Sequence, residues 1–261
     1  MKTIYYYQSF VGLHKLMTHL QDIDIITISS IHFDTDKHGE KHIYLNNNIP
    51  TNPMFNKLWT ETESCSSQGV TIMLMIGGAG GAYTELFNDF TVYYPQLKQL
   101  LNEKTFIGGI NLDIEEEVDI NKIKMLIRLL KDDFPDFKIS MAPVAESMTT
   151  DSIGMGGFSY KELYSSYEGT LIDWFNVQCY NSFSFETYDN IIKNGYPSRK
   201  IVMGHESGQF DKTTFQKALN VVTQCVTTYP AMCGVYDWEY LNAPPDENDC
   251  SLWCKLMKRI I

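Results

Sequence analysis

The sequence has no stretch of about 18 consecutive apolar residues, which is the length that a membrane-spanning helix needs. Its N-terminus carries one basic residue, Lys2, but no apolar core and no small-residue cleavage site of the kind found in secretory signals. We therefore expect no membrane partner. We expect an intracellular product, or one exported by a route that the sequence does not reveal.

Basic residues are also scarce, with 21 lysines and arginines against 32 acidic residues and a formal net charge of −11. No basic stripe occurs, so nucleic acid is not an expected partner. The six cysteines and six histidines show no zinc-type spacing and no H-E-x-x-H motif. We expect no metal and no cofactor. The cysteines are most simply buried free thiols in an intracellular chain, although a bridge among Cys225, Cys233, Cys250 and Cys254 stays open.

The first apolar run is not followed by the G-x-G-x-x-G turn of a dinucleotide-binding fold, because residues 8–12 read Gln-Ser-Phe-Val-Gly. Instead, eight short apolar runs alternate with stretches that are mostly long enough for helices. The runs are Thr3–Gln8, Ile23–Phe33, Val70–Ile76, Ile107–Glu115, Lys138–Pro143, Ile172–Tyr180, Lys200–His205 and Cys233–Tyr240. Apolar residues at helical spacing mark 121–133 and 213–229. Strands that alternate with helices form parallel βαβ units, so we predict an α/β fold, a (β/α)8 TIM barrel.

The length of 261 residues suits one such barrel. No gap between the seventh and eighth runs is long enough for an inserted α+β domain. The longest connections, 34–69 and 145–171, each have room for a helix and a substrate-facing loop. Without repeats, linkers or low-complexity tracts, residues 1–261 are predicted to form a single catalytic-type domain, and we expect a monomer.

Residues 108–115, Gly-Gly-Ile-Asn-Leu-Asp-Ile-Glu, carry the clearest functional pattern. Side chains alternate along a strand, so Asn111, Asp113 and Glu115 point one way and the isoleucines and Leu112 point the other. We expect the polar set to face the barrel interior. Catalytic residues of TIM barrels lie at the carboxyl ends of strands, where Glu115 stands. Two nearby carboxylates raise the pKa of one of them, as a general acid requires.

This stretch resembles the D-x-x-D-x-D-x-E signature of glycoside hydrolase family 18, which includes chitinases and endo-β-N-acetylglucosaminidases. The resemblance implies that Glu115 is the proton donor and that Asp113 holds the acetamido group of the substrate. Asn111 and Gly108 stand where the signature has its other two aspartates. An asparagine can still hydrogen-bond Asp113, but it cannot take up charge.

Two further segments agree with the resemblance in their order along the chain. Residues 73–78 resemble the third-strand S-x-G-G motif, with Met75 in place of the serine. Residues 140–143 resemble the end of the fifth strand, from which Met141 is expected to reach the substrate. Met75 and Gly108 together suggest a less polar barrel core below the site.

Residues 178–181, Gln-Cys-Tyr-Asn, resemble the Q-x-Y-N motif of the short-barrel branch typified by plant class III chitinases. Trp238 matches the tryptophan that forms the floor of the sugar site. The resemblance implies that Tyr180 donates its hydroxyl to the acetamido oxygen. Gln178, Asn181 and Asn111 would complete the substrate contacts. One tyrosine of 5–7 is also expected to face the sugar, and His205 with Glu206 could line the cleft.

The resemblance thus implies a retaining, substrate-assisted hydrolase of β-1,4-linked N-acetylglucosamine, in chitin oligomers or a glycan core. Its expected partner is an oligo- or polysaccharide that contains N-acetylglucosamine. The substitutions at Met75, Gly108 and Asn111 leave two alternatives open. One is a sugar-binding, lectin-like barrel with weak or no catalysis, and the other is a barrel that binds or inhibits proteins or serves as a structural component.

Overall fold

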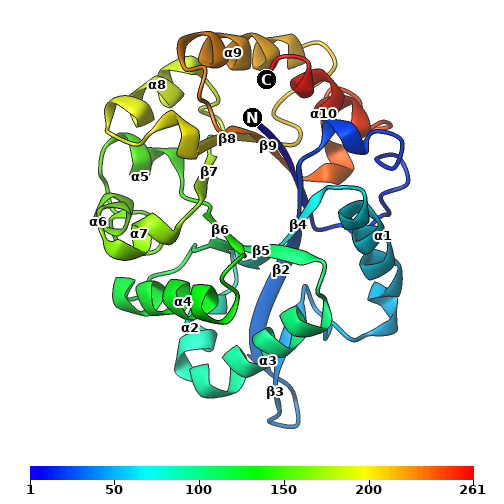
Figure 1. Cartoon of the computed structure of the whole chain (residues 1–261), viewed down its shortest axis with the longest axis vertical. Helices are drawn as coiled ribbons and strands as arrows, with labels where there is room; N and C mark the ends of the chain where they lie inside the picture. The colour runs from blue at the N-terminus through cyan, green and yellow to red at the C-terminus, as the bar shows by residue number, and fades with distance from the viewer.

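Eight parallel strands form a closed ring in the computed structural model, which describes all residues 1–261 (Figure 1). β1 pairs with both β9 and β2, and these two pairings close the barrel. Each predicted apolar run contributes one strand, so the predicted TIM barrel is confirmed. The strands are β1 (Lys2–Tyr7), β2 (Ile25–Thr35), β4 (Thr71–Gly77), β5 (Ile107–Asp113), β6 (Lys138–Met141), β7 (Trp174–Gln178), β8 (Ile201–Glu206) and β9 (Gly234–Trp238).

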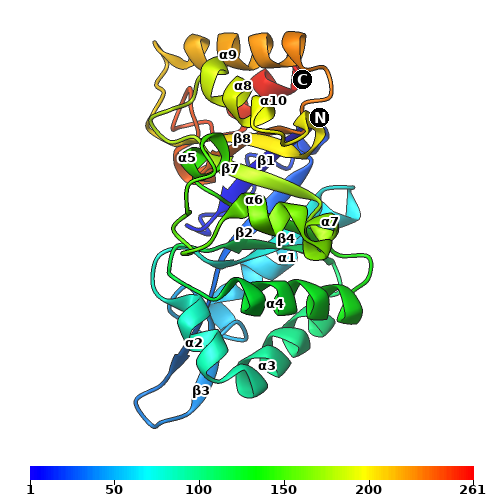
Figure 2. The same cartoon turned by 90° about the vertical axis from the view of Figure 1, so that its left-hand side faces the viewer.

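A ninth strand, β3 (Lys41–Leu45), pairs antiparallel with the end of β2 and was not predicted. The two strands form a hairpin that projects from the barrel (Figure 2). Asp36 fixes the turn, because its Oδ1 accepts hydrogen bonds from the backbone N–H groups of His38 and Glu40 at 2.8 and 2.9 Å. A short run that begins with Lys41 and His42 carries little strand signal by itself.

Helices surround the ring in Figure 1 and cover its outer face. They are α1 (Asn56–Ser67), α2 (Ala82–Asn88), α3 (Phe90–Glu103), α4 (Ile120–Asp133), α5 (Ala145–Thr149), α6 (Tyr160–Ser165), α7 (Tyr167–Leu171), α8 (Phe185–Lys193), α9 (Phe215–Thr228) and α10 (Ser251–Lys258). The two helices predicted from spacing correspond to α4 and α9. Only α9 lies between β8 and β9, so the inserted α+β domain is absent, as predicted. None of these helices combines the length and the apolarity needed to cross a membrane.

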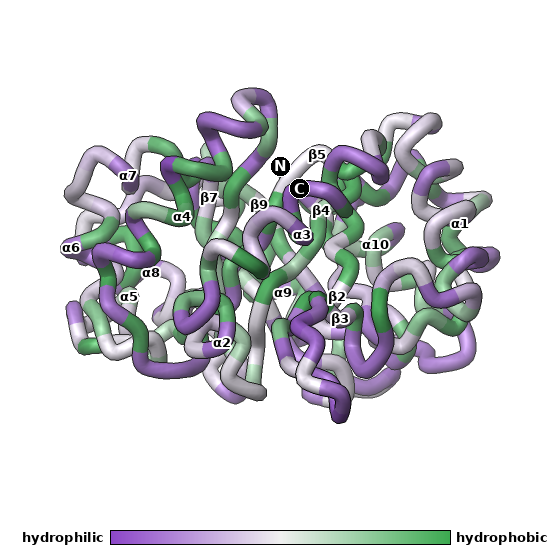
Figure 3. The backbone as a smooth tube through the Cα atoms, turned by 90° about the horizontal axis from the view of Figure 1, so that it is seen from below, coloured by the Kyte–Doolittle hydropathy of each residue, from purple (hydrophilic) through white to green (hydrophobic).

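Alternation along the strands divides the buried apolar side chains into two clusters. The larger one has 65 residues between the barrel and the helices and includes Ile110 and Leu112. The smaller one has nine residues inside the barrel and includes Met73 and Met75. Hydrophobic segments follow the strands, whereas hydrophilic ones gather in the outer loops (Figure 3). Side chains therefore fill the interior of the barrel, and a ligand can bind only where the strands end.

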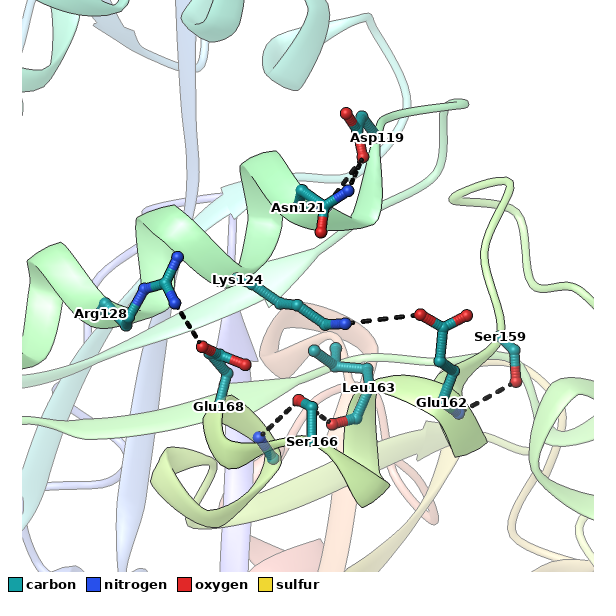
Figure 4. Close-up of polar contacts among 10 residues, drawn as sticks. Asp119, Asn121, Lys124, Arg128, Ser159, Glu162, Leu163, Ser166 and Glu168 are labelled. Atoms are coloured by element: carbon teal, nitrogen blue, oxygen red, sulfur yellow. Dashed lines mark hydrogen bonds and ion pairs between the residues drawn. The ribbon is translucent and has the colours of Figure 1, made fainter.

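Charged pairs join the outer helices α4, α6 and α7 (Figure 4). Arg128 Nη1 lies 2.7 Å from Glu168 Oε1, and Lys124 Nζ lies 3.4 Å from Glu162 Oε1. The two acids differ in burial, because the Glu168 side chain is 7% exposed and that of Glu162 is 62% exposed. A buried carboxylate depends on its partner more than an exposed one does, so the Arg128–Glu168 pair contributes more to helix packing.

The C-terminal helix α10 is fastened to the barrel by buried polar contacts. Trp253 Nε1 donates to His205 Nε2 at 2.7 Å, and the other ring nitrogen of His205 lies 3.1 Å from Asp237 Oδ1. Tyr5 donates its hydroxyl to the carbonyl of Cys250. These contacts use side chains that point outward from β1, β8 and β9, and so α10 covers this part of the barrel.

Candidate active site

A pocket of about 270 Å³ opens at the carboxyl ends of the barrel strands. Its lining brings together residues from six strands or the loops that follow them: Gln8, Ser30, His32, Met75, Gly77, Gly78, Ala79, Asp113, Glu115, Gln178, Tyr180 and Trp238. Five of the predicted site residues are among them, namely Asp113, Glu115, Gln178, Tyr180 and Trp238. This is the end of a TIM barrel at which ligands bind.

Asp113 and Glu115 meet at the side-chain amide of Gln178. Gln178 Nε2 lies 3.1 Å from Asp113 Oδ1, 3.3 Å from Glu115 Oε1 and 2.9 Å from the carbonyl oxygen of Ala142. An amide nitrogen has two hydrogens, so these three acceptors share them. β5 ends at Asp113, two residues earlier than predicted, and Glu115 stands in the following loop, half-buried. Gln178 thus joins the two carboxylates across the mouth of the barrel.

Burial and charge act together on Asp113, whose side chain is almost completely enclosed. Burial raises the pKa of Asp113 well above its usual range, and the nearby charge of Glu115 raises it further. The hydrogen bond from Gln178 opposes this rise because it stabilises the charged form. The raised pKa expected for one member of the pair is therefore found at Asp113.

Tyr180 is positioned by a second tyrosine beneath it. The hydroxyl of Tyr236 donates to the hydroxyl oxygen of Tyr180 at 3.3 Å. Burial raises the pKa of Tyr180 well above its usual range, so its phenol stays protonated at neutral pH. Because Tyr236 supplies the donor of their hydrogen bond, the Tyr180 proton is available to a ligand in the pocket.

Gly77, the last residue of β4, is required by the close approach of β5. Gly77 has φ of 95°, and a Cβ there would lie 2.1 Å from the backbone oxygen of Asp113. Gly78 donates its backbone N–H to that same oxygen at 2.9 Å. Position 77 therefore has no room for a side chain. The two glycines hold the loop after β4 against the backbone of Asp113, and they line the pocket without side chains that would fill it.

Asn111 does not hydrogen-bond Asp113, although its amide is capable of such a bond. Its Nδ2 donates to Ser140 Oγ at 2.8 Å, and its Oδ1 accepts from the Tyr6 hydroxyl at 3.2 Å. Tyr6 in turn accepts from Asn176 Nδ2 at 2.8 Å. This uncharged network lies below the pocket and gives both polar atoms of the Asn111 side chain a partner, which leaves Asp113 to the amide of Gln178.

The remaining departures from the family signature lie at different depths. Met75 faces the barrel interior and lines the pocket, within the apolar interior cluster. Gly108 is half-buried where β5 begins, next to a register irregularity, and Gly109 is the residue that approaches Met73 inside the barrel. The less polar interior is thus due to Met75 and its neighbours, and Gly108 has no part in it.

Trp238 forms one side of the pocket and rests on Tyr6, with ring centroids 5.2 Å apart. The orientation of β1 shows which tyrosine of residues 5–7 faces the barrel interior. Tyr6 points into the barrel, whereas Tyr5 and Tyr7 belong to the core under the helices. Tyr6 is buried and is not part of the pocket lining, so it supports Trp238 from below.

Four other candidates do not line this pocket. Met141 is fully buried between the barrel and the helices, because Ser140 is the inward-facing residue of β6, and its assignment to the substrate is wrong. Asn181 is exposed, with φ of 57°, beyond the pocket lining. His205 is completely buried and bonded to Trp253, and Glu206 is exposed outside the pocket.

Glu116 has a structural role that the sequence did not reveal. Its carboxylate accepts hydrogen bonds from the backbone N–H groups of Tyr83 and Thr84, at 2.6 and 3.1 Å, where α2 begins. This bridge links the loop after β5, which carries Glu115, to the loop after β4. Tyr83 and Thr84 lie 33 and 32 positions from Glu116 along the chain, so only the fold could identify Glu116 as a helix cap.

The pocket continues into a groove at each end. On one side, Gln178 and Tyr180 also line a space of about 580 Å³ that reaches α5 and α8. On the other side, Gln8 and His32 also line a space of about 1020 Å³ along the β2–β3 hairpin. The carboxylates therefore lie within a cleft that is longer than one sugar ring. No cluster of metal-ligating side chains occurs in it or elsewhere in the chain.

Solved structures support this description of the fold. A fungal endo-β-N-acetylglucosaminidase of glycosyl hydrolase family 18 is 28% identical and has a TM-score of 0.87, with 100% of this chain and 98% of that chain covered. A chitinase from Aspergillus fumigatus is 30% identical and has a TM-score of 0.83, with 94% of each chain covered. A chitinase from Ipomoea carnea is 17% identical, covers both chains fully and shares the fold, with a TM-score of 0.65. No family sequence model and no curated protein sequence matches the chain.

The closed barrel, with its carboxylates at the carboxyl end of β5, defines a protein of the glycoside hydrolase type. The chain belongs to glycoside hydrolase family 18.

Proposed function

We propose that this protein hydrolyses β-1,4 bonds next to N-acetylglucosamine by a retaining, substrate-assisted mechanism. The observation that carries the proposal is the meeting of Asp113 and Glu115 at Gln178, in a pocket that also contains Tyr180 and Trp238. Glycosidases of this kind need one carboxyl group to donate a proton, but no second one as nucleophile, because the acetamido oxygen of the substrate takes that role.

In the first step the glycosidic C–O bond breaks, and its electron pair stays on the leaving oxygen, which takes the proton of Glu115. The acetamido carbonyl oxygen bonds to the anomeric carbon and forms an oxazolinium ion. Asp113 accepts from the acetamido N–H, and Tyr180 donates to the acetamido oxygen and holds it near its target. Trp238 offers an apolar face to the sugar ring.

In the second step a water molecule gives its proton to Glu115 and attacks the anomeric carbon, which opens the oxazolinium ring. Each displacement inverts the configuration of the anomeric carbon, so the two together retain it. The grooves at both ends of the pocket accommodate a sugar chain that extends past both sides of the cleaved bond. This arrangement favours cleavage within a chain over removal of terminal units.

The direct test is hydrolysis of chitooligosaccharides by the wild type and by Glu115→Gln. Loss of the proton donor is expected to lower kcat by at least about 100-fold, and the first product of the wild type should be the β-anomer. Glu117→Gln is a matched control because Glu117 is exposed and lies outside the pocket, and it should keep wild-type activity. Equal inertness of wild type and Glu115→Gln on chitin, peptidoglycan and N-glycan substrates would refute hydrolysis.

The uncharged network around Asn111 favours one second candidate, a sugar-binding protein with weak or no catalysis. The carboxylate that the family signature has at position 111 is replaced by an amide bound to Ser140 and Tyr6. Titration with chitotetraose separates the two functions, because a binding protein forms a complex without releasing product.

A further inference from the structure

We propose that His32, held by Ser30 on a bulge of β2, is a specificity-determining residue that selects longer sugar chains. This inference rests on the proposed function of the same cleft. It assigns a role to a histidine for which no sequence motif suggested one.

The bulge determines where His32 points. The pairing of β2 with β4 changes register between Ile28 and Ile31. Ile28 packs in the core under the helices, and so does Ile31, although they are three positions apart and side chains on one face of a regular strand are an even number of positions apart. A bulge reverses the alternation of side chains beyond it. Ser30 and His32 therefore face the cleft, whereas a regular strand would have turned both toward the helices.

Asn46 keeps the bulge in this conformation. Its Oδ1 accepts from the backbone N–H of Ser30 at 3.1 Å, and its own backbone N–H donates to the Ser30 carbonyl oxygen at 2.9 Å. Its Nδ2 donates to the carbonyl oxygen of Gln8 at 3.0 Å, and its φ is 52°. Asparagine tolerates this left-handed conformation better than most residues. One side chain thus ties the bulge to the end of β1.

The imidazole of His32 has one nitrogen with a partner and one without. Nε2 lies 2.9 Å from Ser30 Oγ. Nδ1 has no hydrogen-bond partner in the protein, and it faces Gly80, where even a Cβ would lie only 3.6 Å away. The half-buried ring lies beside Glu116, but burial outweighs that charge and lowers the pKa of His32. The ring is therefore neutral at pH 7, with Nδ1 able to donate to or accept from a sugar hydroxyl.

His32 stands where the pocket meets the hairpin groove, because it lines both. A short substrate centred on Asp113 and Trp238 does not extend into the hairpin groove. A longer chain that enters the groove must pass the imidazole. A hydrogen bond to His32 from a sugar in the groove strengthens binding only for chains that reach the groove. Longer chains therefore bind more tightly than shorter ones.

The test compares chitotriose with chitopentaose, in hydrolysis and in equilibrium binding, for the wild type and three variants. His32→Phe keeps a flat ring without polar atoms. It is expected to weaken pentamer binding more than trimer binding, and so to reduce the preference for the pentamer about three- to tenfold, the usual effect of one hydrogen bond. His32→Gln restores a polar atom and should recover most of the preference. His38→Phe alters an exposed histidine at the hairpin tip and should have no effect.

The two proposals fail in different ways. If the wild type binds both oligomers but cleaves neither, hydrolysis is refuted, and the binding arm still tests His32. If His32→Phe keeps the full length preference of the wild type, the role of His32 is refuted whatever the activity. Should His32→Phe not fold, Ser30→Ala removes only the hydroxyl that holds the ring, and an unchanged length preference in that variant also refutes the role.

Discussion

Replacing Asp113 with asparagine is predicted to make the protein more stable at neutral pH. The substitution keeps the shape of the side chain and removes a buried charge. Burial and the neighbouring Glu115 both disfavour the ionised form of Asp113, and its pKa is raised accordingly. An asparagine oxygen can still accept from Gln178, so the variant loses an unfavourable charge but keeps its main contact.

The geometry gives the magnitude. One nitrogen, Gln178 Nε2, lies 3.1 Å from Asp113 Oδ1 and 3.3 Å from Glu115 Oε1, so these oxygens are at most about 6.4 Å apart. At that separation two charges repel by about 2.5 kcal/mol if the effective dielectric constant is about 20. Part of this is offset by the stronger hydrogen bond that a carboxylate makes. We therefore expect Asp113→Asn to raise the free energy of unfolding by about 2 kcal/mol, or Tm by about 4 °C for this length.

The pH dependence identifies the cause. Because the pKa of Asp113 is raised in the folded state, the folded wild type binds more protons than the unfolded chain above about pH 4. Wild-type stability therefore falls as the pH rises from 4 toward the raised pKa, and the variant lacks this loss. Its advantage should be near zero at pH 4 and largest at neutral pH.

Thermal unfolding of both proteins at pH 4 to 8 provides the measurement. Asp133→Asn is a matched control of opposite sign, because Lys98 holds the pKa of Asp133 below its usual range and the loss of that pairing should slightly destabilise the protein. A Tm of Asp113→Asn below that of the wild type at pH 7, or a gain that does not change with pH, would contradict the reasoning. If the proposed function is correct, Asp113→Asn is also expected to lose nearly all hydrolytic activity.

Three other predictions concern the scaffold. Trp253→Phe leaves buried His205 Nε2 without its donor and should cost about 1–3 kcal/mol; an unchanged Tm would exclude a structural role for this bond. Arg128→Ala should cost about 1 kcal/mol because it leaves Glu168 buried without its cation, whereas Lys124→Ala should cost less than about 0.5 kcal/mol; chemical denaturation compares the two. All six thiols are buried and free, and burial raises the pKa of each, so a thiol reagent should modify them only after unfolding.

Much of the barrel could be predicted because its signal is local and repeated. Each strand is a short apolar run between polar loops, and the eight runs occur in an order that only parallel pairing with crossover helices satisfies. The inward direction of Asn111 and Asp113 follows from a period of two within one regular strand. β3 escaped prediction because its stability comes from pairing with β2, outside the barrel.

Errors arose where a side chain's direction depends on neighbouring strands. Met141 was assigned to the substrate from its position in a motif, but the register of β6 against β5 turns Ser140 inward and Met141 outward. The amide of Asn111 is able to hydrogen-bond Asp113, but in the folded barrel its partners are Ser140 and Tyr6. Such choices depend on residues tens to hundreds of positions away.

The alternation of strands and helices can be predicted from the sequence, and so can the inward direction of Asn111 and Asp113 on β5 and the positions of Glu115, Tyr180 and Trp238 near strand ends. The contacts of Gln178 with Asp113 and Glu115, the inward direction of Tyr6 and the bulge in β2 that turns His32 into the cleft appear only in the folded barrel. The physical reason is that periodicity within a strand is a local property, whereas hydrogen-bond partners, burial and register are set by strands that meet only when the barrel closes.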